Sequence, residues 1–393
     1  MVIWVVAILL LIVLDEWLGR RRKRHAPKKE YPLRQSNITL FTNGQHLFAD
    51  YFLEIKKATH HIHVLFYIVK TDDISQQFFF FLQQKAKEGV EVRLLVDWVG
   101  GFRLSRKTIR SLKESGVRFA FSQKPSFPYF FYQLNRRNHR KITVIDGKIG
   151  YIGGFNIGKE YIGQDTDFGD WRDYHLKING EGVMDLQTQF LTDWKAATAE
   201  VLQQETRYFP ELPRGTIVHR FIATNGNGLE EDFAHLIRQA KREIIIGSPY
   251  FIPSKKVMKA LIDALKHGVA VTILVPLKAD HPLVKEAALP YFYRLLKHGA
   301  HIYRFYQGFY HAKTIIIDDD VCDIGTANFD KRSFFLNGEM NCFIYDRAFT
   351  QQMKHVIRYE LSRSERLTLD WWKKRSVWER GKESISALLE RWL

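Results

Sequence analysis

One short pattern occurs twice in this chain, and it constrains the fold more than any other feature. The pattern is a histidine, one residue, a lysine, four residues and an aspartate, and its copies are His139, Lys141 and Asp146, and His311, Lys313 and Asp318. An asparagine, Asn156 or Asn328, follows seventeen residues after each histidine. A single histidine-x-lysine match has little meaning, but two copies with matching sequels indicate two similar halves.

The residues after each lysine predict how the motif is presented. Residues 142–145 and 314–317 are β-branched apolar runs, which is typical of buried strands. Alternation along a strand places a histidine and a lysine two residues apart on the same face. As members of the motif, Asp146 and Asp318 are counted with the expected catalytic residues. The same period places them farther from that face, so stabilisation of the repeat is the alternative role for both.

Two such halves would bring two imidazoles and two ammonium groups together, a set that suits a phosphate. One imidazole can attack phosphorus, since histidine is largely unprotonated near neutral pH. The other can protonate the leaving oxygen as general acid. The lysines and asparagines would neutralise charge on the phosphate oxygens, and this chemistry needs no metal or other cofactor. A single histidine in a strand is more often a core histidine with satisfied hydrogen bonds, but two matched pairs weaken that alternative.

The length and charge of the chain limit the number of domains and the kind of partner that we expect. A chain of 393 residues exceeds one typical core, so two domains are expected. The net charge of +16 implies a polyanionic partner, either nucleic acid or an anionic membrane, and composition does not choose between them. The two cysteines, Cys322 and Cys342, lie in apolar surroundings and predict buried thiols in a reducing compartment.

The N-terminal sequence is an apolar run with a basic flank. Residues 2–14 are unbroken apolar sequence, and Arg20 opens a cluster of five basic residues. The charge follows the run instead of preceding it, which argues against a secretory signal. We expect residues 1–19 to form a transmembrane anchor and residues 20–35 a basic tether, with the catalytic body in the cytoplasm. The alternative is a peripheral or re-entrant segment, because the run is short for the roughly 30 Å hydrocarbon core.

Beyond the tether, each half alternates helices and strands in the same order. In the first half we predict helices over residues 46–57 and 73–87 and strands over residues 62–69 and 90–97. In the second half we predict helices over residues 229–240 and 255–266 and strands over residues 243–248 and 270–276. This order predicts an α/β fold of two fused units, residues 36–209 and 210–393, each with a mixed or parallel sheet flanked by helices.

Several short segments around the two motifs resemble a known family. They are Asn-His-Arg-Lys at 138–141, Tyr-Ile-Gly-Gly-Phe-Asn-Ile-Gly at 151–158, Trp-Arg-Asp at 171–173, Tyr-His-Ala-Lys at 310–313, Gly-Thr-Ala-Asn-Phe-Asp at 325–330 and Arg-Ser-Phe at 332–334. These segments resemble the phospholipase D superfamily and, within it, the bacterial cardiolipin synthase branch. The similarity runs from about residue 36 to the C-terminus. It implies two phospholipase D-like units that share one active site, preceded here by one membrane helix, at a bacterial cell membrane.

The resemblance also implies the order of the chemistry. His139 is expected to be the nucleophile that forms a phosphatidyl-histidine, and His311 the acid that protonates the departing alcohol. His311 then deprotonates the incoming alcohol, although the near symmetry of the two motifs allows the reverse assignment. The acceptor decides the product, because water gives phosphatidic acid and a second phosphatidylglycerol gives cardiolipin and glycerol.

Further site residues are implied by the same resemblance. Thr326, Asn328 and Asn156 match phosphate-contacting positions, and the first half has a glycine where the second has Thr326. An acidic residue downstream of each motif is expected to orient its histidine. Glu339 takes this place for the second motif and Asp173 for the first.

Two segments rich in aromatic residues are candidates for contact with membrane lipid. An insertion over residues 124–138, directly before the first motif, carries five aromatic residues and then Arg136 and Arg137. We expect it to line an acyl-chain entrance or dip into a headgroup layer, with an ordinary packed loop as the alternative. Residues 371–392 mix tryptophan and leucine with basic residues, and predict an amphipathic helix that lies on lipid or packs against the body.

Three functions compete for this chain. The first is a membrane-anchored phosphatidyltransferase that makes cardiolipin and glycerol from two phosphatidylglycerol molecules. The second is a phospholipase D-type hydrolase or nuclease that uses water, for which the charge of +16 is the main support. The third is a catalytically silent lipid-binding or scaffold protein, against which both intact motifs argue. The expected anchor and the family-specific segments favour the first, with an anionic phospholipid membrane and no nucleic acid as partner.

Overall fold

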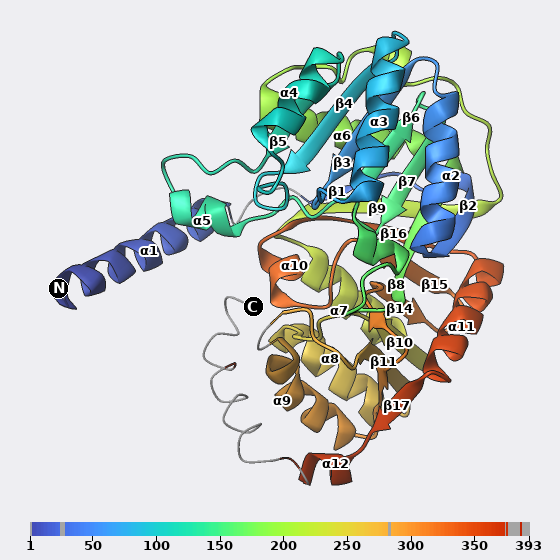
Figure 1. The fold of residues 1–393 in the computed structure, drawn as a ribbon. Helices are drawn as coiled ribbons and strands as arrows, with labels where there is room; N and C mark the ends of the chain where they lie inside the picture. The colour runs from blue at the N-terminus through green and yellow to red at the C-terminus, as the bar shows by residue number, and fades with distance from the viewer. Residues whose placement is uncertain (1, 24–27, 282–283, 374, 376–385, 387–393) are drawn as a thin grey trace.

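Two α/β halves pack against each other, and one long helix projects from them (Figure 1). The computed structural model describes residues 2–23, 28–281, 284–373, 375 and 386. The strands of the first half are β2 (Arg34–Asn43), β3 (His61–Phe66), β4 (Glu91–Asp97), β5 (Arg118–Ser122), β6 (Ile142–Ile145), β7 (Ile149–Gly153) and β8 (Trp171–Gly180). Its helices are α2 (Gly44–Lys57), α3 (Asp73–Lys87), α4 (Arg106–Glu114), α5 (Phe130–Asn135) and α6 (Val183–Thr198), with 3-10 turns η1 (Lys159–Ile162) and η2 (Thr206–Tyr208).

The second half repeats this order. Its strands are β9 (Ile217–Asn225), β10 (Glu243–Gly247), β11 (Ala270–Pro276), β12 (His301–Phe305), β13 (Phe309–Tyr310), β14 (Thr314–Ile317), β15 (Val321–Gly325), β16 (Gly338–Ile344) and β17 (Ser364–Leu367). Its helices are α7 (Leu229–Gln239), α8 (Lys255–Lys266), α9 (Val284–Leu296), α10 (Lys331–Phe335), α11 (Arg347–Leu361) and α12 (Leu369–Lys373).

The predicted helices and strands are present in both halves. α3, α8 and β11 have the predicted bounds, and the other predicted elements differ by at most three residues at an end. Polar side chains fix the helix starts, since Asp72 accepts from the Ser75 amide at 3.1 Å and Ser254 accepts from the Val257 amide at 3.2 Å. The predicted boundary at residues 209–210 falls between η2 and β9.

The two sheets that the sequence predicts are joined into one mixed sheet. Its hydrogen-bonded order is β5, β4, β3, β6, β7, β8, β2, β9, β16, β15, β14, β10, β11, β12 and β17. The pairs β3–β4–β5 and β10–β11–β12 are parallel. The join is the antiparallel pair of β2 and β9, the first long strand of each half, with Arg34 opposite His219. The separate sheets therefore become one because their first strands meet.

A hydrophobic core also crosses between the halves. Phe190 of α6 and Met353 of α11 belong to the same buried cluster, which includes Ile142 and Ile316 from the two motif strands. Separate clusters lie under α2 and α3 in the first half and under α7, α8 and α9 in the second. The motif strands are thus buried on both sides, which explains their unbroken apolar sequence.

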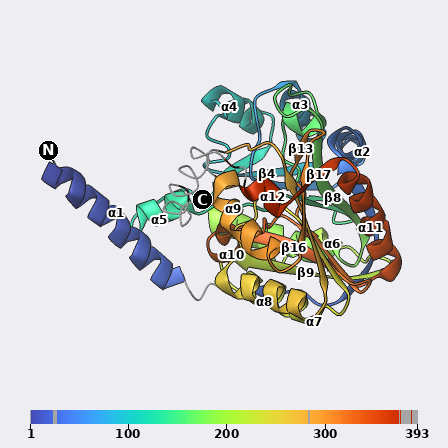
Figure 2. The ribbon, with the colours of Figure 1, turned by 90° about the horizontal axis from the view of Figure 1, so that it is seen from below.

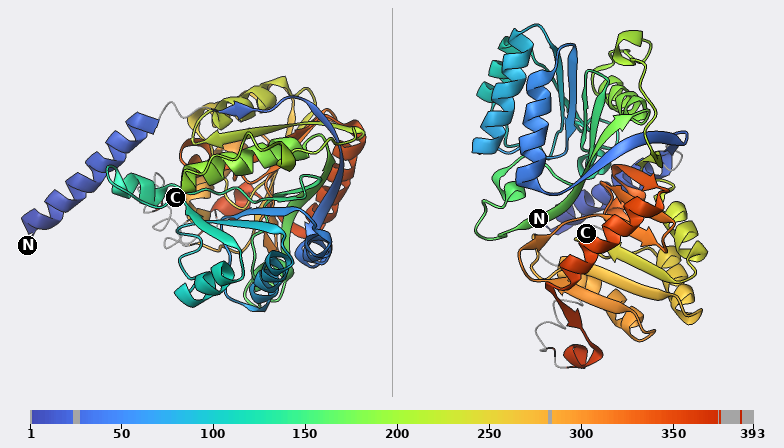
Figure 3. Two further views of the ribbon diagram at one scale, coloured as in Figure 1. Left: turned by 90° about the horizontal axis from the view of Figure 1, so that it is seen from above. Right: turned by 90° about the vertical axis from the view of Figure 1, so that its right-hand side faces the viewer.

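Helix α1 (Val2–Lys23) projects away from the body (Figures 2 and 3). It contacts α5, where Asp15 accepts from the Tyr132 amide at 2.9 Å and Glu16 accepts from Asn135 Nδ2 at 3.1 Å. Exposed apolar side chains lie along it: Trp4, Leu10, Leu11, Val13, Leu14 and Trp17. Over the described ranges, the structure contains no helix with the length and apolar character needed to cross a membrane.

Much of the predicted tether is regular structure where it is described. Residues 20–23 continue α1, and β1 (Lys29–Glu30) pairs with β9. β2 begins at Arg34, while residues 24–27 lie outside the described residues. The insertion before the first motif contains α5, which packs on α1; its expected role at an acyl-chain entrance or headgroup layer stays a prediction.

The described start of the C-terminal segment packs against the body. Trp372 stacks on Tyr293 with ring centres 4.9 Å apart, and the Arg304 guanidinium lies 4.4 Å from the Trp371 ring. Residues 376–385 and 387–393 of the predicted amphipathic helix lie outside the described residues.

The motif aspartates lie at the far end of their strands from the histidines. Asp146 accepts hydrogen bonds from the amides of Thr59, His60 and His61 at 2.8 to 2.9 Å. Asp318 does the same for the amides of residues 241–243 in the second half. Burial opposes ionisation of Asp146, but these amides outweigh it and hold its pKa below the ordinary value. Both aspartates therefore tie the motif strand to the strand beside it.

We expect Asp146→Ala to lower the free energy of unfolding by about 2 kcal/mol, because three amides lose their acceptor. Urea unfolding at neutral pH measures this loss, and Asp320→Asn in the corresponding turn of the second half is the control. The depressed pKa means that the Asp146 contribution is present above the pKa of the unfolded chain and is lost as the pH falls through the folded pKa. A difference between wild type and variant that grows toward acid pH would contradict this role.

Candidate active site

The two motif histidines come together because each motif pairs its backbone with the other half. The His139 amide donates to the Gly338 carbonyl at 2.8 Å, and the His311 amide donates to the Arg172 carbonyl at 2.7 Å. Strand β13, directly before His311, pairs in parallel with β8 of the first half. Each histidine is therefore held at the edge of the opposite half.

The carboxylates beside the histidines are exchanged between the halves. His139 Nδ1 lies 3.0 Å from Glu339 Oε2, and His311 Nδ1 lies 2.6 Å from Asp173 Oδ2. The sequence predicted the opposite pairs, and that pairing is wrong. β16 and β8, which carry the two acids, each run beside the motif of the other half. With Nδ1 on a carboxylate, each ring keeps Nε2 for a substrate.

The two carboxylates have different surroundings. Glu339 accepts from Thr326 Oγ1 at 2.5 Å, whereas Asp173 has Lys313 Nζ at 3.3 Å. A Cβ added to Gly154 would lie 2.0 Å from Asp173 Oδ1. Glycine therefore stands where the second half has Thr326 because the Asp173 carboxylate occupies that space. Thr326, which was expected to contact phosphate, holds Glu339 in this structure.

Each motif lysine folds back over its own histidine. Lys141 Nζ donates to the His139 carbonyl at 2.8 Å and lies 5.3 Å from the centre of the Tyr67 ring. Lys313 Nζ donates to the His311 carbonyl. Both lysines are buried directly beside the imidazoles.

Burial sets the charge state of the site. It lowers the pKa of His139, and lowers that of His311 to about 4, although the carboxylate beside each ring acts in the opposite direction. Burial also lowers the pKa of Lys141 to about 7. The carboxyls of Asp173 and Glu339 are buried too, but neighbouring cationic groups outweigh burial and hold their pKa below the ordinary value. Near neutral pH the two imidazoles are neutral, the form that can attack phosphorus.

Both histidines line a cavity of about 640 Å³, a size typical of small-ligand sites. Asn156 and Asn328 line it as well. Asn156 Oδ1 already accepts from the Ile68 amide at 3.1 Å, whereas Asn328 Oδ1 is buried with no hydrogen-bond partner among the described residues. The Asn328 side-chain oxygen is therefore available to accept a hydrogen bond from a substrate. In the described part of the chain, no group of three or more His, Cys, Asp or Glu side chains could hold a metal ion.

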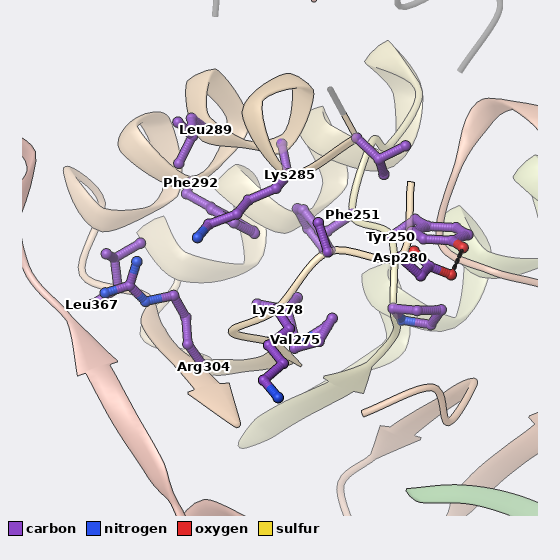
Figure 4. A pocket seen from close by; sticks show the side chains of 15 residues that line it. Tyr250, Phe251, Val275, Lys278, Asp280, Lys285, Leu289, Phe292, Arg304 and Leu367 are labelled. Carbon is purple, nitrogen blue, oxygen red and sulfur yellow. Dashed lines mark hydrogen bonds between the residues drawn. The ribbon is translucent and has the colours of Figure 1, made fainter. Parts of the chain in front are cut away.

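A second, apolar slot opens beside this cavity (Figure 4). The two share Tyr250, Asp280 and Val284, and the Tyr250 hydroxyl donates to Asp280 Oδ2 at 2.5 Å. Apolar side chains from the segment after β10, from β11, α9 and β17 line much of the slot: Phe251, Val275, Ala288, Leu289, Phe292 and Leu367. The slot is small, about 30 Å³, and mostly apolar, whereas the histidine cavity is larger and mixes polar and apolar side chains.

Arg140 is a site residue that the motif pattern did not reveal. Its guanidinium donates to the Glu339 carbonyl at 3.1 Å, to the Thr224 carbonyl at 2.6 Å and to Asp193 Oδ1 at 2.9 Å. It thereby fixes the backbone of the residue that holds His139. The sequence signal for Arg140 was the difference between the motifs, because the second motif has Ala312 at this position. Alternation along the strand turns this residue away from the face that carries the histidine and the lysine.

Comparison with known proteins agrees with this geometry. A family model described as cardiolipin synthase, PLD-like domain, matches residues 51–194 and 233–360. The chain belongs to this family. Minor cardiolipin synthase ClsB of Bacillus subtilis is 45% identical over 392 residues, which cover 99% of this chain and 98% of the relative. Cardiolipin synthase 2 of Staphylococcus epidermidis is 39% identical over 360 residues, with 90% of this chain and 74% of the relative covered.

Solved structures share the fold at low sequence identity. Phosphatidylserine synthase of Haemophilus influenzae matches 96% of this chain and 100% of its own with a TM-score of 0.72 at 15% identity. Polyphosphate kinase of Porphyromonas gingivalis matches 84% of this chain and 48% of its own with a TM-score of 0.57 at 15% identity. The predicted resemblance to the cardiolipin synthase branch is confirmed, and with it the assignment of the chain to an enzyme family of the phospholipase D superfamily.

We expect kcat/KM on a phosphodiester substrate to fall on both sides of a narrow pH window. The acid limb lies below the ordinary histidine pKa of about 6.5, because burial keeps the attacking imidazole neutral to lower pH. The alkaline limb lies near the Lys141 pKa of about 7, because loss of that charge weakens phosphate binding. A pH series with circular dichroism at each point measures both limbs. A flat profile between about pH 5 and 9 would contradict these charge states.

Proposed function

We propose that this protein is a membrane-bound phosphatidyltransferase that makes cardiolipin and glycerol from two phosphatidylglycerol molecules. The observation that carries the proposal is the pair of carboxylate-bound histidines, His139 and His311, which line one cavity and each have a buried motif lysine beside them. Its family relatives named cardiolipin synthases support the choice of substrate. No nucleic acid partner is needed for this activity.

The reaction would proceed in two displacements at phosphorus. His139 Nε2 attacks the phosphorus of the first lipid, the bond from phosphorus to the headgroup glycerol oxygen breaks, and His311 gives that oxygen its proton. His311 then takes the proton from a glycerol hydroxyl of the second lipid, whose oxygen attacks the phosphatidyl-histidine and displaces His139. The phosphodiester charge raises the pKa of the imidazoles as it enters, which supplies the protonated form that His311 needs.

The surroundings of the cavity favour lipid over other phosphodiesters. The apolar slot offers contact to hydrocarbon next to the cavity, which a phospholipid brings and a nucleic acid does not. The exposed apolar face of α1, followed by Arg20 and Arg21, suits attachment to an anionic bilayer with the body on the cytoplasmic side. Hydrolysis by water, the alternative, depends on whether the second lipid excludes water from the phosphatidyl-histidine.

A lipid assay with purified protein tests the proposal. Phosphatidylglycerol in detergent with EDTA should yield cardiolipin and glycerol, and His139→Ala and His311→Ala should each lower the rate at least roughly 100-fold. With His139 as nucleophile, His311→Ala should retain a phosphatidyl adduct on His139, visible by mass spectrometry of the intact protein. Phosphatidic acid as the only product would mean a hydrolase, and no product with retained lipid binding would favour a scaffold.

The slot gives a separate prediction about acyl chains. Ala288→Leu fills part of it, so we expect KM for a long-chain phosphatidylglycerol to rise about tenfold, or about 1.4 kcal/mol. A dihexanoyl substrate should be turned over as by wild type, because its chains do not reach far into the slot. Ala196→Leu, at an exposed position of α6, is the control. Equal effects on both substrates would mean that the slot does not hold the chain.

A further inference from the structure

We infer that Arg137 and Arg332 form a second phosphate site, which holds the phosphodiester of the acceptor lipid while the phosphate of the donor lipid reacts at the histidines. The inference rests on the proposed function, because only an acceptor that is itself a phospholipid brings a second phosphate. In that reaction one phosphorus exchanges its ester bond and the other stays intact. The intact phosphate is only one glycerol unit away from the attacking hydroxyl, so it must lie in the same cavity.

The two guanidiniums lie in that cavity and come from different halves. Arg137 precedes His139 by two residues, and Arg332 belongs to α10 of the second half; both line the cavity with the two histidines. Arg332 donates to the Asn135 carbonyl at 2.7 Å and to Asn135 Oδ1 at 2.8 Å, so its position is fixed by α5. Arg137 Nη1 donates to the Arg136 carbonyl at 2.7 Å. Both arginines are thus anchored through backbone or amide oxygens near the cavity wall.

The charges elsewhere in the cavity favour the wall with Arg137 and Arg332 as the site for an anion. Lys70 Nζ is paired with Glu160 Oε1 at 2.6 Å, and Asp280 accepts from Tyr250, so that part of the wall is neutralised or acidic. By contrast, Arg137 donates to the carbonyls of Leu134 and Arg136 and forms no ion pair with a carboxylate among the described residues. Burial lowers the pKa of Arg332, and the nearby charge of Arg137 lowers it further. Two guanidiniums that repel each other at a partly buried wall are stabilised when a phosphate binds between them.

Asp330 is the acidic group that could oppose this role. It also lines the cavity and lies two residues from Arg332. Its carboxylate accepts from the Ser333 amide at 2.7 Å and caps α10. Burial raises its pKa to about 6, so it is still mostly ionised at neutral pH, but the α10 amide that it caps holds its carboxylate. A phosphodiester, which keeps its charge at every pH used in such assays, is therefore favoured over a neutral ligand at the arginine pair.

This second site would decide which acceptor the phosphatidyl-enzyme uses. An acceptor with its own phosphate gains the two arginine contacts, whereas glycerol and water do not. The site should therefore favour cardiolipin formation over exchange and hydrolysis without changing the first displacement. A competition between two acceptors on one phosphatidyl-enzyme isolates this effect.

The experiment offers deuterated glycerol as a neutral acceptor together with phosphatidylglycerol in detergent. Mass spectrometry gives the ratio of cardiolipin to deuterated phosphatidylglycerol, and both products arise from the same intermediate. We expect Arg137→Gln and Arg332→Gln each to lower this ratio about tenfold or more, with glycerol exchange retained. Arg137→Lys should keep part of the ratio, and Arg110→Gln, at an exposed position of α4, should leave it unchanged.

The outcomes separate this inference from the function on which it rests. An unchanged ratio in both glutamine variants would overturn the second phosphate site and leave the synthase reaction standing. Loss of both products in equal proportion would also overturn it, because the arginines would then act on the donor lipid or on folding. Wild-type protein that exchanges glycerol but makes no cardiolipin would overturn the proposed function and the second site with it.

Discussion

The active site depends on one exchange of backbone hydrogen bonds between the halves. The His139 amide bonds to Gly338 on the second half, and the His311 amide bonds to Arg172 on the first. These bonds place each motif beside the strand that carries the carboxylate for its histidine. Neither half alone holds an imidazole and its carboxylate together, so the chemistry requires both. The joined sheet and the core shared by α6 and α11 make this arrangement rigid.

The exchange also gives the two histidine-bound carboxylates different hydrogen-bond donors. Glu339 is held by a threonine hydroxyl, while Asp173 is held by the ammonium group of Lys313 and occupies the space above Gly154. Hydroxyl and ammonium donors stabilise a carboxylate to different degrees. The two carboxylates therefore differ in how strongly they accept the hydrogen bond from their imidazole. The two-step transfer that we propose needs one histidine to attack and the other to carry a proton. The single glycine-for-threonine difference between the repeats is a physical basis for that division.

Helix α5 and the apolar slot both lie next to the cavity that the histidines line, and α5 contacts helix α1. Asn135 of α5 donates to Glu16 of α1 and accepts from Arg332 in the cavity wall. The helix with the exposed apolar face is therefore linked through one short insertion to the cationic end of the cavity. The apolar slot under α9 lies beside the same cavity, at Tyr250. Cationic and apolar contacts are thus offered by neighbouring parts of the protein, as the proposed phospholipid substrate would require.

The sequence by itself determined the repeat, the alternating α/β elements and the chemistry of the motif, because these follow from local spacing and period. Residues 73–87 and 255–266 are helices as predicted, and His139, His311 and the asparagines line one cavity. Only the tertiary structure decided which carboxylate serves which histidine, that β2 and β9 join two sheets, and that Arg140 fixes Glu339. These are contacts between residues far apart in the chain, and no local pattern encodes which half of a near-symmetric repeat a strand edge will meet.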